Sequence, residues 1–356
     1  MSELLVPSPW NGIVHDVPHL EMQWLKNLPP NTYCALWQGW PDIDLPLGYD
    51  LYVVSFHLEA VDIKWLDSQC RKINSSIIVL SDSNFYDRKL PDNLYCFTYY
   101  YWHSQLEKIL GWYPKNPTKK IQYKFSSICN RVTQSKALVT TMLLEYARND
   151  SMIKLSDWIE PKNMHYNSLT NRKILDYILD VFNKKYLNQT IAFDDFDNTT
   201  DNFQRNTSNP LIPALQDCAL HFTNESFHYS YHNDGNNTFL YPGPFLTEKT
   251  LKCLVAECGF VAVGQSNTYK TLKKLGFRFD YDFDTSWDDL SGDLDRLEKI
   301  LDLIKDLLGY TSQQIFEMTV DSSRHNRAHI QNGNFGNICR THNVSTANEI
   351  LERFVT

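Results

Sequence analysis

The sequence lacks the features that mark membrane, secreted and zinc-stabilised proteins. No run approaches about 18 apolar residues, so no membrane span is expected. The opening Met1-Ser2-Glu3-Leu4 has neither the basic nor the apolar region of a signal peptide. The eight cysteines contain no Cys-x-x-Cys spacing, so no metal site is expected. Scattered cysteines without a secretion signal predict a cytoplasmic setting, which is the host cytoplasm if the protein is viral.

Positive charge is not in excess. The 34 Lys and Arg residues are outnumbered by 42 Asp and Glu residues, which gives a formal net charge of −8. A non-specific binder of DNA or RNA needs a dominant basic surface, so that class is excluded, while a local basic groove stays open. With 356 residues and a hydrophobic fraction of 42%, the chain is long enough for two or three domains, or one large one.

The first third of the chain combines buried-strand runs with a helical spacing. Residues 1–48 are rich in Pro and Trp and are expected to be irregular. Leu51–Phe56 and residues 76–80 are near-continuous apolar runs, as expected of buried parallel strands. Apolar residues at helical spacing lie between them, and residues 95–102 and 105–110 predict a third strand and a short helix. Strands alternating with helices predict a doubly wound α/β sheet.

A second set of strands and helices follows a Pro-containing linker at 111–120. Thr247 is a good N-cap for a helix that we expect Gly259 to terminate, and Gly276 is expected to stop a later helix. The tail is expected to carry a solvated or acceptor-facing basic patch at 324–329 and a final helix at 346–354. We expect strands at 123–128, 218–222 and 260–264, helices at 134–147, 172–182, 267–275, 293–308 and 311–318, and a long acidic loop at 194–209.

These patterns predict an α/β protein with two Rossmann-like domains facing a cleft. The expected division is an N-terminal domain at 1–118, a C-terminal domain at 119–320 and a tail at 321–356. Parallel sheets bind their ligands beyond the carboxyl ends of the strands, so the cleft between the two domains is the expected site.

One segment combines the parts needed to hold a nucleotide diphosphate. Thr247, Glu248 and Lys249 open a helix, and the free N–H groups of a helix N-terminus suit phosphate. Lys249 adds a positive charge, and a carboxylate in the same turn can accept hydrogen bonds from a ribose diol. The alternative is that Thr247 and Glu248 only cap the helix and that Lys249 is solvated.

The order of motifs around this segment resembles a group of glycosyltransferases with the GT-B fold. The group occurs in phage and bacterial genomes and is distantly similar to the α1,3-fucosyltransferases. Its pattern covers roughly the second half of the chain, and Asn130-Arg131 resembles the start of its C-terminal domain. The matching segments are Glu225-Ser226, Thr247-Glu248-Lys249-Thr250, Gly259-Phe260-Val261-Ala262-Val263-Gly264, Leu272-Lys273-Lys274-Leu275-Gly276-Phe277 and Phe283-Asp284-Thr285-Ser286-Trp287-Asp288-Asp289.

The resemblance implies a donor site in the C-terminal domain. Glu248 would hold the ribose or the sugar, Glu225 would lie near the sugar, and Lys249 and Arg131 would hold the diphosphate. Members carry a second arginine a few residues after the first, and Ser135 and Lys136 stand near that position here. Donor-site residues are therefore expected at Arg131, Lys136, Glu225, Thr247, Glu248 and Lys249. Such enzymes need no metal or other cofactor.

A catalytic base for an inverting reaction would come from the N-terminal, acceptor-side domain. His57 and Glu59 follow the run Leu51–Phe56, and Asp82 follows the run at 76–80, so these three are the main candidates, beside His103 after the run at 99–102. The expected function is sugar transfer from a nucleotide-diphosphate donor to an acceptor hydroxyl. The acceptor stays open between a glycan or small molecule and a hydroxymethylated base of phage DNA. The alternative function is non-catalytic binding of nucleotides or sugars.

Overall fold

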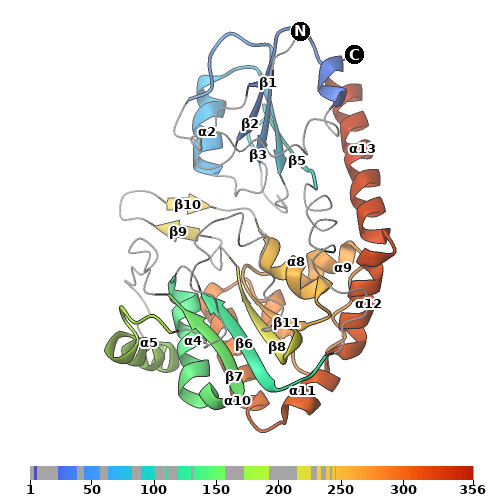
Figure 1. Ribbon diagram of the computed structural model, residues 1–356. Helices are drawn as coiled ribbons and strands as arrows, with labels where there is room; N and C mark the ends of the chain where they lie inside the picture. The colour runs from blue at the N-terminus through green and yellow to red at the C-terminus, as the bar shows by residue number, and fades with distance from the viewer. Residues whose placement is uncertain are drawn as a thin grey trace. The chain divides into compact units, whose positions relative to one another are not determined.

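The protein is an α/β protein with two parallel sheets, each in its own compact unit (Figure 1). The computed structural model describes residues 4–5, 23–37, 44–56, 63–81, 90–100, 110, 119–129, 132–156, 172–191, 215–225, 231–233, 238–240, 243–244 and 246–355. Unit 1 contains Met1–Gln105, Ser230–Phe245 and Gly333–Thr356, and unit 2 contains Leu106–Tyr229 and Leu246–Asn332. The sequence-based division at 118 and 320 is linear, whereas these units are interleaved along the chain.

Unit 1 is built on one sheet whose strands follow the order of the sequence. Its order is β1-β2-β3-β4-β5 and every neighbouring pair is parallel. The strands expected at Leu51–Phe56 and 76–80 are confirmed as β3 and β4. The elements are β1 (Leu4–Leu5), the 3-10 helix η1 (Gln23–Asn27), β2 (Thr32–Trp37), β3 (Leu51–Phe56), α2 (Ile63–Lys72), β4 (Ser76–Ser81) and β5 (Leu94–Thr98).

The expectation that residues 1–48 are irregular is wrong for β2. This strand pairs with β3 along its whole length, from Thr32 opposite Leu51 to Trp37 opposite Phe56. Its sequence mixes polar, small and aromatic residues, so no periodicity indicates it. Pairing with β3 and burial of Tyr33 and Ala35 stabilise it as a strand.

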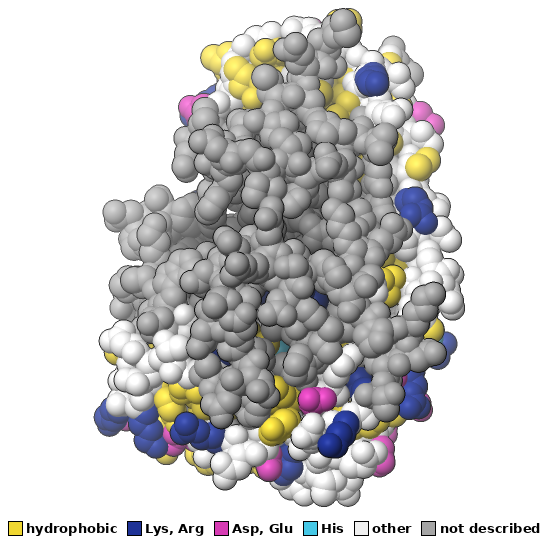
Figure 2. All heavy atoms as spheres, in the orientation of Figure 1, with side chains coloured by type: hydrophobic (Ala, Val, Ile, Leu, Met, Phe, Trp, Pro, Cys, Tyr) yellow, Lys and Arg dark blue, Asp and Glu magenta, His cyan; other side chains and the backbone are white. Residues whose placement is uncertain are grey.

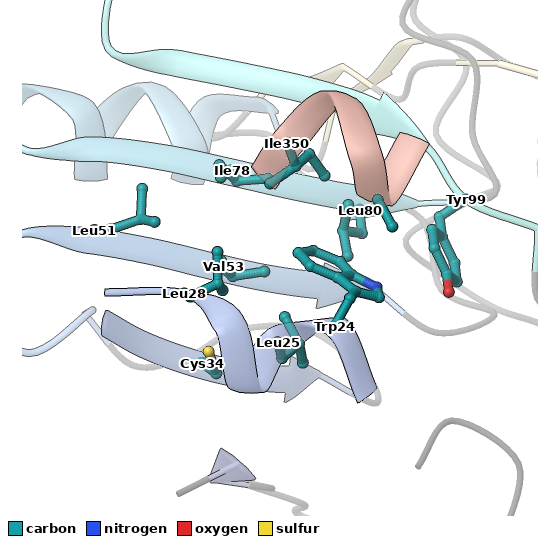
Figure 3. Close-up of a cluster of buried hydrophobic side chains, with 11 residues drawn as sticks. Trp24, Leu25, Leu28, Cys34, Leu51, Val53, Ile78, Leu80, Tyr99 and Ile350 are labelled. Atoms are coloured by element: carbon teal, nitrogen blue, oxygen red, sulfur yellow. The ribbon is translucent and has the colours of Figure 1, made fainter. Parts of the chain in front are cut away.

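Both faces of the unit 1 sheet are buried. One face packs on α2, where Tyr52, Val54 and Leu66 belong to a single hydrophobic core. The other face is covered by η1 and by α13 (Asn334–Phe354), with Ile350 packed against the side of the sheet that carries Val53 and Ile78 (Figure 3). The final helix is therefore longer than the expected 346–354, and it completes the core of unit 1.

Polar contacts fix α13 at the carboxyl end of β5. Asn343 pairs with both backbone groups of Tyr100: Tyr100 N donates to Asn343 Oδ1 at 2.9 Å, and Asn343 Nδ2 donates to Tyr100 O at 2.9 Å. His342 Nε2 lies 3.0 Å from Thr98 O. No neighbouring strand pairs with these backbone groups, and the side chains of α13 form their hydrogen bonds instead.

Unit 2 has a four-stranded parallel sheet in the order β11-β8-β6-β7. The expected strands at 123–128, 218–222 and 260–264 are confirmed within a residue or two. The elements of unit 2 are β6 (Tyr123–Cys129), α4 (Gln134–Tyr146), η2 (Arg148–Asp150), β7 (Ser151–Leu155), α5 (Lys173–Lys185), β8 (Cys218–Asn224), α8 (Glu248–Val255), β11 (Gly259–Val263), α9 (Thr268–Lys274), η4 (Ser286–Asp289), α10 (Asp293–Leu307), α11 (Ser312–Glu317) and α12 (Val320–Gln331). The antiparallel pair β9 (Tyr231–Asn233) and β10 (Thr238–Leu240) belongs to unit 1.

Two crossovers leave the middle of this sheet in opposite directions. The chain runs from β6 through α4 to β7 on one side, and from β8 through α8 to β11 on the other. Because such crossovers are right-handed, α4 and α8 are expected on opposite faces of the sheet. Consistent with this, α4 packs on β6 and β7, whereas α8 packs on β8 and β11.

The expected role of Gly259 as a helix terminator is wrong, while that of Gly276 is confirmed. Helix α8 ends at Val255, and the left-handed residue that follows is Glu257, with φ 56°. Gly259 instead opens β11, where a Cβ atom would lie 2.3 Å from Thr319 Oγ1. Gly276 has φ 90° and follows Leu275, the C-cap residue of α9, as a C-terminal glycine should.

The expected solvated basic patch at 324–329 is also wrong, because α12 turns much of it inward. Arg327 is 3% exposed and its Nη1 donates to Val255 O at 2.6 Å, at the end of α8. His329 Nε2 lies 2.8 Å from Leu275 O. Arg324 is exposed and pairs with Glu257 at 3.3 Å. Much of the segment therefore satisfies buried carbonyls rather than facing solvent.

Some expected elements lie outside the described residues. These are most of the helix at 105–110, the linker at 111–118 and the loop at 194–209.

We expect Gly259→Ala to destabilise the protein by about 1–3 kcal/mol, because the new methyl group overlaps Thr319 in a closely packed region. Urea unfolding followed by circular dichroism measures the change. The matched control is Gly336→Ala in α13, where the added Cβ meets nothing closer than 3.4 Å. That control is expected to be neutral or to stabilise by up to about 1 kcal/mol. Equal effects of the two substitutions would contradict the packing argument.

Candidate functional site

Buried polar side chains gather at the carboxyl edge of the unit 2 sheet, where β6 and β8 end side by side. The strand order reverses between these two strands, which is where sheets of this type bind ligands. Polar residues are seldom fully buried without a structural or binding role. The buried polar residues at or next to these strand ends and helix starts are Ser127, Thr133, Gln134, Ser135, Lys136, Asn224, Glu225, Thr247 and Thr250.

Glu225 joins the end of β8 to the first turn of α8. Its side chain is 2% exposed. One carboxyl oxygen accepts from Thr250 Oγ1 at 2.5 Å and from the backbone N of Thr247 at 3.4 Å. The other accepts from Thr247 Oγ1 at 2.5 Å. The predicted site residues Glu225 and Thr247 are therefore in direct contact, although they are 22 positions apart in the sequence.

The predicted helix start at Thr247 is confirmed. Thr247 is extended, and its Oγ1 accepts from the backbone N of Lys249 at 3.3 Å, as in a standard N-cap. The ammonium group of Lys249 also donates to Thr247 Oγ1, at 3.2 Å. Glu248 is the first residue of α8, and its side chain lies outside the described part of the chain.

The start of α4 has a different electrostatic character. Thr133 occupies its N-cap position but makes no capping hydrogen bond, and no acidic residue lies in the first turn. Lys136 does lie there and is 5% exposed. A lysine in this first turn adds to the positive potential of the helix N-terminus. Arg131, the other predicted phosphate ligand near this helix, lies outside the described residues.

Asn224 is a polar residue of the site that sequence reasoning missed. Its Nδ2 donates to Ser127 Oγ at 2.8 Å and to Ile128 O at 3.2 Å, which ties the ends of β8 and β6 together. Its Oδ1 is buried and accepts no hydrogen bond from the residues that the structure describes. In the sequence, its position directly before Glu225 at the end of a predicted strand could have indicated it.

Asp288 caps the start of α9 and was also missed. Its Oδ2 accepts from the backbone N of Tyr269 at 2.9 Å and of Lys270 at 3.2 Å. Burial raises the pKa of this carboxyl group to about 6, and the two backbone bonds oppose that rise. The residue belongs to the acidic-aromatic segment 283–289, where the sequence does not show which aspartate turns inward.

Arg296 holds the carboxyl end of β11 from α10. It is 1% exposed, and its Nε donates to Gly264 O at 3.0 Å. Its two other nitrogens donate to Leu290 O at 2.8 Å and to Asp293 at 2.6 Å. These bonds fix the backbone at one corner of the candidate site.

The described residues contain no group of three His, Cys, Asp or Glu side chains placed to hold a metal ion. Cys218 and His221 on β8, and Cys339 and His342 on α13, have Cys-x-x-His spacing, but neither pair gathers a third ligand there. None of the helices in the described ranges is long and apolar enough to cross a membrane. The base candidates His57, Glu59 and Asp82 lie outside the described residues.

Fold and site together define an α/β protein with two parallel sheets and a buried polar edge between two central strands. Comparison of the chain with protein-family models, curated proteins and solved structures finds no significant match.

We expect Asp288→Asn to remove a pH dependence of stability between about pH 4 and 6. In this window the folded carboxyl group, with its pKa of about 6, binds more protons than the unfolded one. The free energy of unfolding of the wild type therefore rises, through this group, as the pH falls from 6 to 4. The asparagine oxygen can still accept from Tyr269 and Lys270, so the variant is expected to fold.

Urea unfolding of both proteins at pH 4.5 and 7.5 measures this effect. The wild type is expected to gain stability relative to Asp288→Asn at the lower pH, because other titrating groups are common to both proteins. A stability difference that is the same at the two pH values would refute the raised pKa. Asp288→Ala also removes the acceptor and is expected to be less stable than Asp288→Asn at pH 7.5.

Proposed function

We propose that this protein is a glycosyltransferase that moves a sugar from a nucleotide-diphosphate donor to an acceptor hydroxyl. The observation that supports it most is the buried polar edge between β6 and β8, at the reversal of strand order. Two helix starts, those of α4 and α8, belong to this edge, each with a lysine in its first turns. The motif order that resembles GT-B glycosyltransferases covers the same residues.

The proposed donor site divides its work among these residues. Lys136 and Lys249, together with Arg131, bind the diphosphate, because cations and free backbone N–H groups stabilise phosphate charge. Glu248 binds the ribose or the sugar. Charge on the leaving diphosphate is met by these groups without a metal ion.

The second domain and the acceptor belong to the same proposal. Unit 1 would supply the acceptor side across a GT-B cleft, with the base taken from His57, Glu59 or Asp82. All eight cysteines are free thiols, which favours a reducing compartment, and we place the protein in the cytoplasm, or the host cytoplasm if it is viral.

A glycan or small molecule is the first acceptor to test, because two of the basic residues that could serve a DNA acceptor are engaged within the protein. Arg327 is buried, and Lys124 pairs with Asp150 at 3.3 Å, so neither offers a free charge. Other lysines pair with neighbouring acids, as Lys184 does with Asp180 at 2.6 Å. Basic and acidic side chains are intermixed over the lower part of the face in Figure 2. A hydroxymethylated base of phage DNA is the second acceptor to test.

We expect at least one UDP- or GDP-sugar to raise the melting temperature, since a ligand at a hundred times its Kd stabilises the folded state by roughly 2.7 kcal/mol. Lys249→Gln is expected to weaken that ligand roughly ten- to a hundredfold, because a charge-assisted hydrogen bond is lost. Lys273→Gln is the matched control, since Lys273 is exposed at the end of α9, and it is expected to bind like the wild type.

Transfer and donor hydrolysis are then measured with a glycan panel and with duplex DNA that contains hydroxymethyl bases. Binding without turnover on any acceptor would favour the alternative, a non-catalytic nucleotide- or sugar-binding protein. If no nucleotide sugar shifts the melting temperature and no transfer occurs, the proposed function is rejected.

A further inference from the structure

The hydroxyl group of Thr247 links Glu225 to Lys249. Thr247 Oγ1 lies 2.5 Å from a carboxyl oxygen of Glu225, 3.3 Å from the backbone N of Lys249 and 3.2 Å from Lys249 Nζ. A hydroxyl group has one proton to donate and two lone pairs to accept with. These three contacts use all of them.

The direction of each bond follows from its partners. The backbone N–H and the ammonium group of Lys249 can only donate, so Thr247 Oγ1 accepts from both. Its single proton must then point to Glu225, which accepts it. The other oxygen of Glu225 is engaged by Thr247 N and Thr250 Oγ1. Glu225 therefore acts as an acceptor at both oxygens, and its contacts lie within the protein.

We propose that Glu225 is a positioning residue: it fixes the proton of Thr247, and through Thr247 it orients Lys249 and the first turn of α8. The inference rests on the proposed function for the ligand of Lys249, a nucleoside diphosphate. It changes the role of Glu225 from a contact with the sugar to a support for the group that binds the diphosphate. The burial of Glu225, at 2% exposed, agrees with a support role.

Glu225→Gln separates the two roles because it keeps the shape and replaces one oxygen by a donor. If the amide nitrogen faces Thr247 Oγ1, that hydroxyl must release one of its two bonds to Lys249 in order to accept from it. If the amide nitrogen faces the other way, it meets the backbone N–H of Thr247, and two donors oppose each other. In either orientation the support of Lys249 is weakened.

The first test compares a free nucleoside diphosphate, UDP or GDP, with the matching nucleotide sugar by calorimetry. A positioning role predicts that Glu225→Gln weakens both ligands by the same factor, roughly ten- to a hundredfold. It also predicts that the loss nearly vanishes when Lys249→Met is already present, as in a double-mutant cycle between coupled residues. A loss confined to the nucleotide sugar, or additive losses in the double variant, would overturn the proposal in favour of direct sugar contact.

The second test needs no ligand, so it holds even if the wild type binds no nucleotide and the proposed function fails. Amide hydrogen exchange at Lys249 and Leu251, whose backbone N atoms bond to Thr247, is expected to be roughly tenfold or more faster in Glu225→Gln. Exchange at Tyr269 in α9, which Asp288 caps, is expected to stay unchanged. Unchanged exchange at Lys249 and Leu251 would refute the positioning role.

Two further variants support these tests, one as a control and one as a substitute. Glu349→Gln makes the same chemical change on the exposed face of α13 and is expected to match the wild type in both measurements. If Glu225→Gln does not fold, Thr250→Val replaces it. Thr250→Val removes one donor to Glu225 and leaves Thr247 intact, so it is expected to act in the same direction with a smaller factor.

Discussion

The layout of unit 2 depends on one constraint, the right-handedness of parallel crossovers. Since β7 and β11 lie on opposite sides of the central pair β6 and β8, the helices that lead to them cover opposite faces. Both helices nevertheless start at the same edge, next to the ends of two adjacent strands. The N–H groups of these helix N-termini have no hydrogen-bond partner within the helix or the sheet. Buried polar side chains lie at this edge because they can supply such partners.

Charge is distributed unevenly among the helices that begin at this edge. Glu225 meets the start of α8 and Asp288 meets the start of α9, and each comes from a part of the chain outside the helix it caps. The start of α4 has Lys136 and no acid in its first turn. The protein thus provides its own anions for two helix starts.

The sequence predicts those features that depend on local pattern. The apolar runs of β3, β4 and β11, the cap at Thr247 and the stop at Gly276 are read correctly, because each is decided within a few residues. The role of Gly259 was predicted wrongly, because the Thr319 side chain, which leaves no room for a Cβ atom there, lies 60 positions away in the sequence. The burial of Arg327 was missed for the same reason. A polar helix face is expected to be solvated, and the sequence does not show that Arg327 donates to the carbonyl group of Val255.

The candidate site shows the same limit. The sequence identified Glu225 and Thr247 as site residues, yet only the structure brings them into contact and uses both oxygens of the carboxyl group within the protein. Asn224 and Asp288 were missed, because nothing in a run of polar residues tells which side chain is buried. The interleaved units were not predicted, because sequence patterns do not show that the C-terminal helix packs on a sheet formed near the N-terminus.

The position of α13 has a consequence for biosynthesis. The face of the unit 1 sheet that carries Ile78 and Leu80 is covered in part by Ala347 and Ile350, which the ribosome adds more than 200 residues later. Unit 2 is complete once residue 332 has been translated, so it can reach its native packing first. The earliest strands to emerge are then among the last to gain a full apolar covering. During that interval their apolar face is exposed, and such surfaces are bound by chaperones.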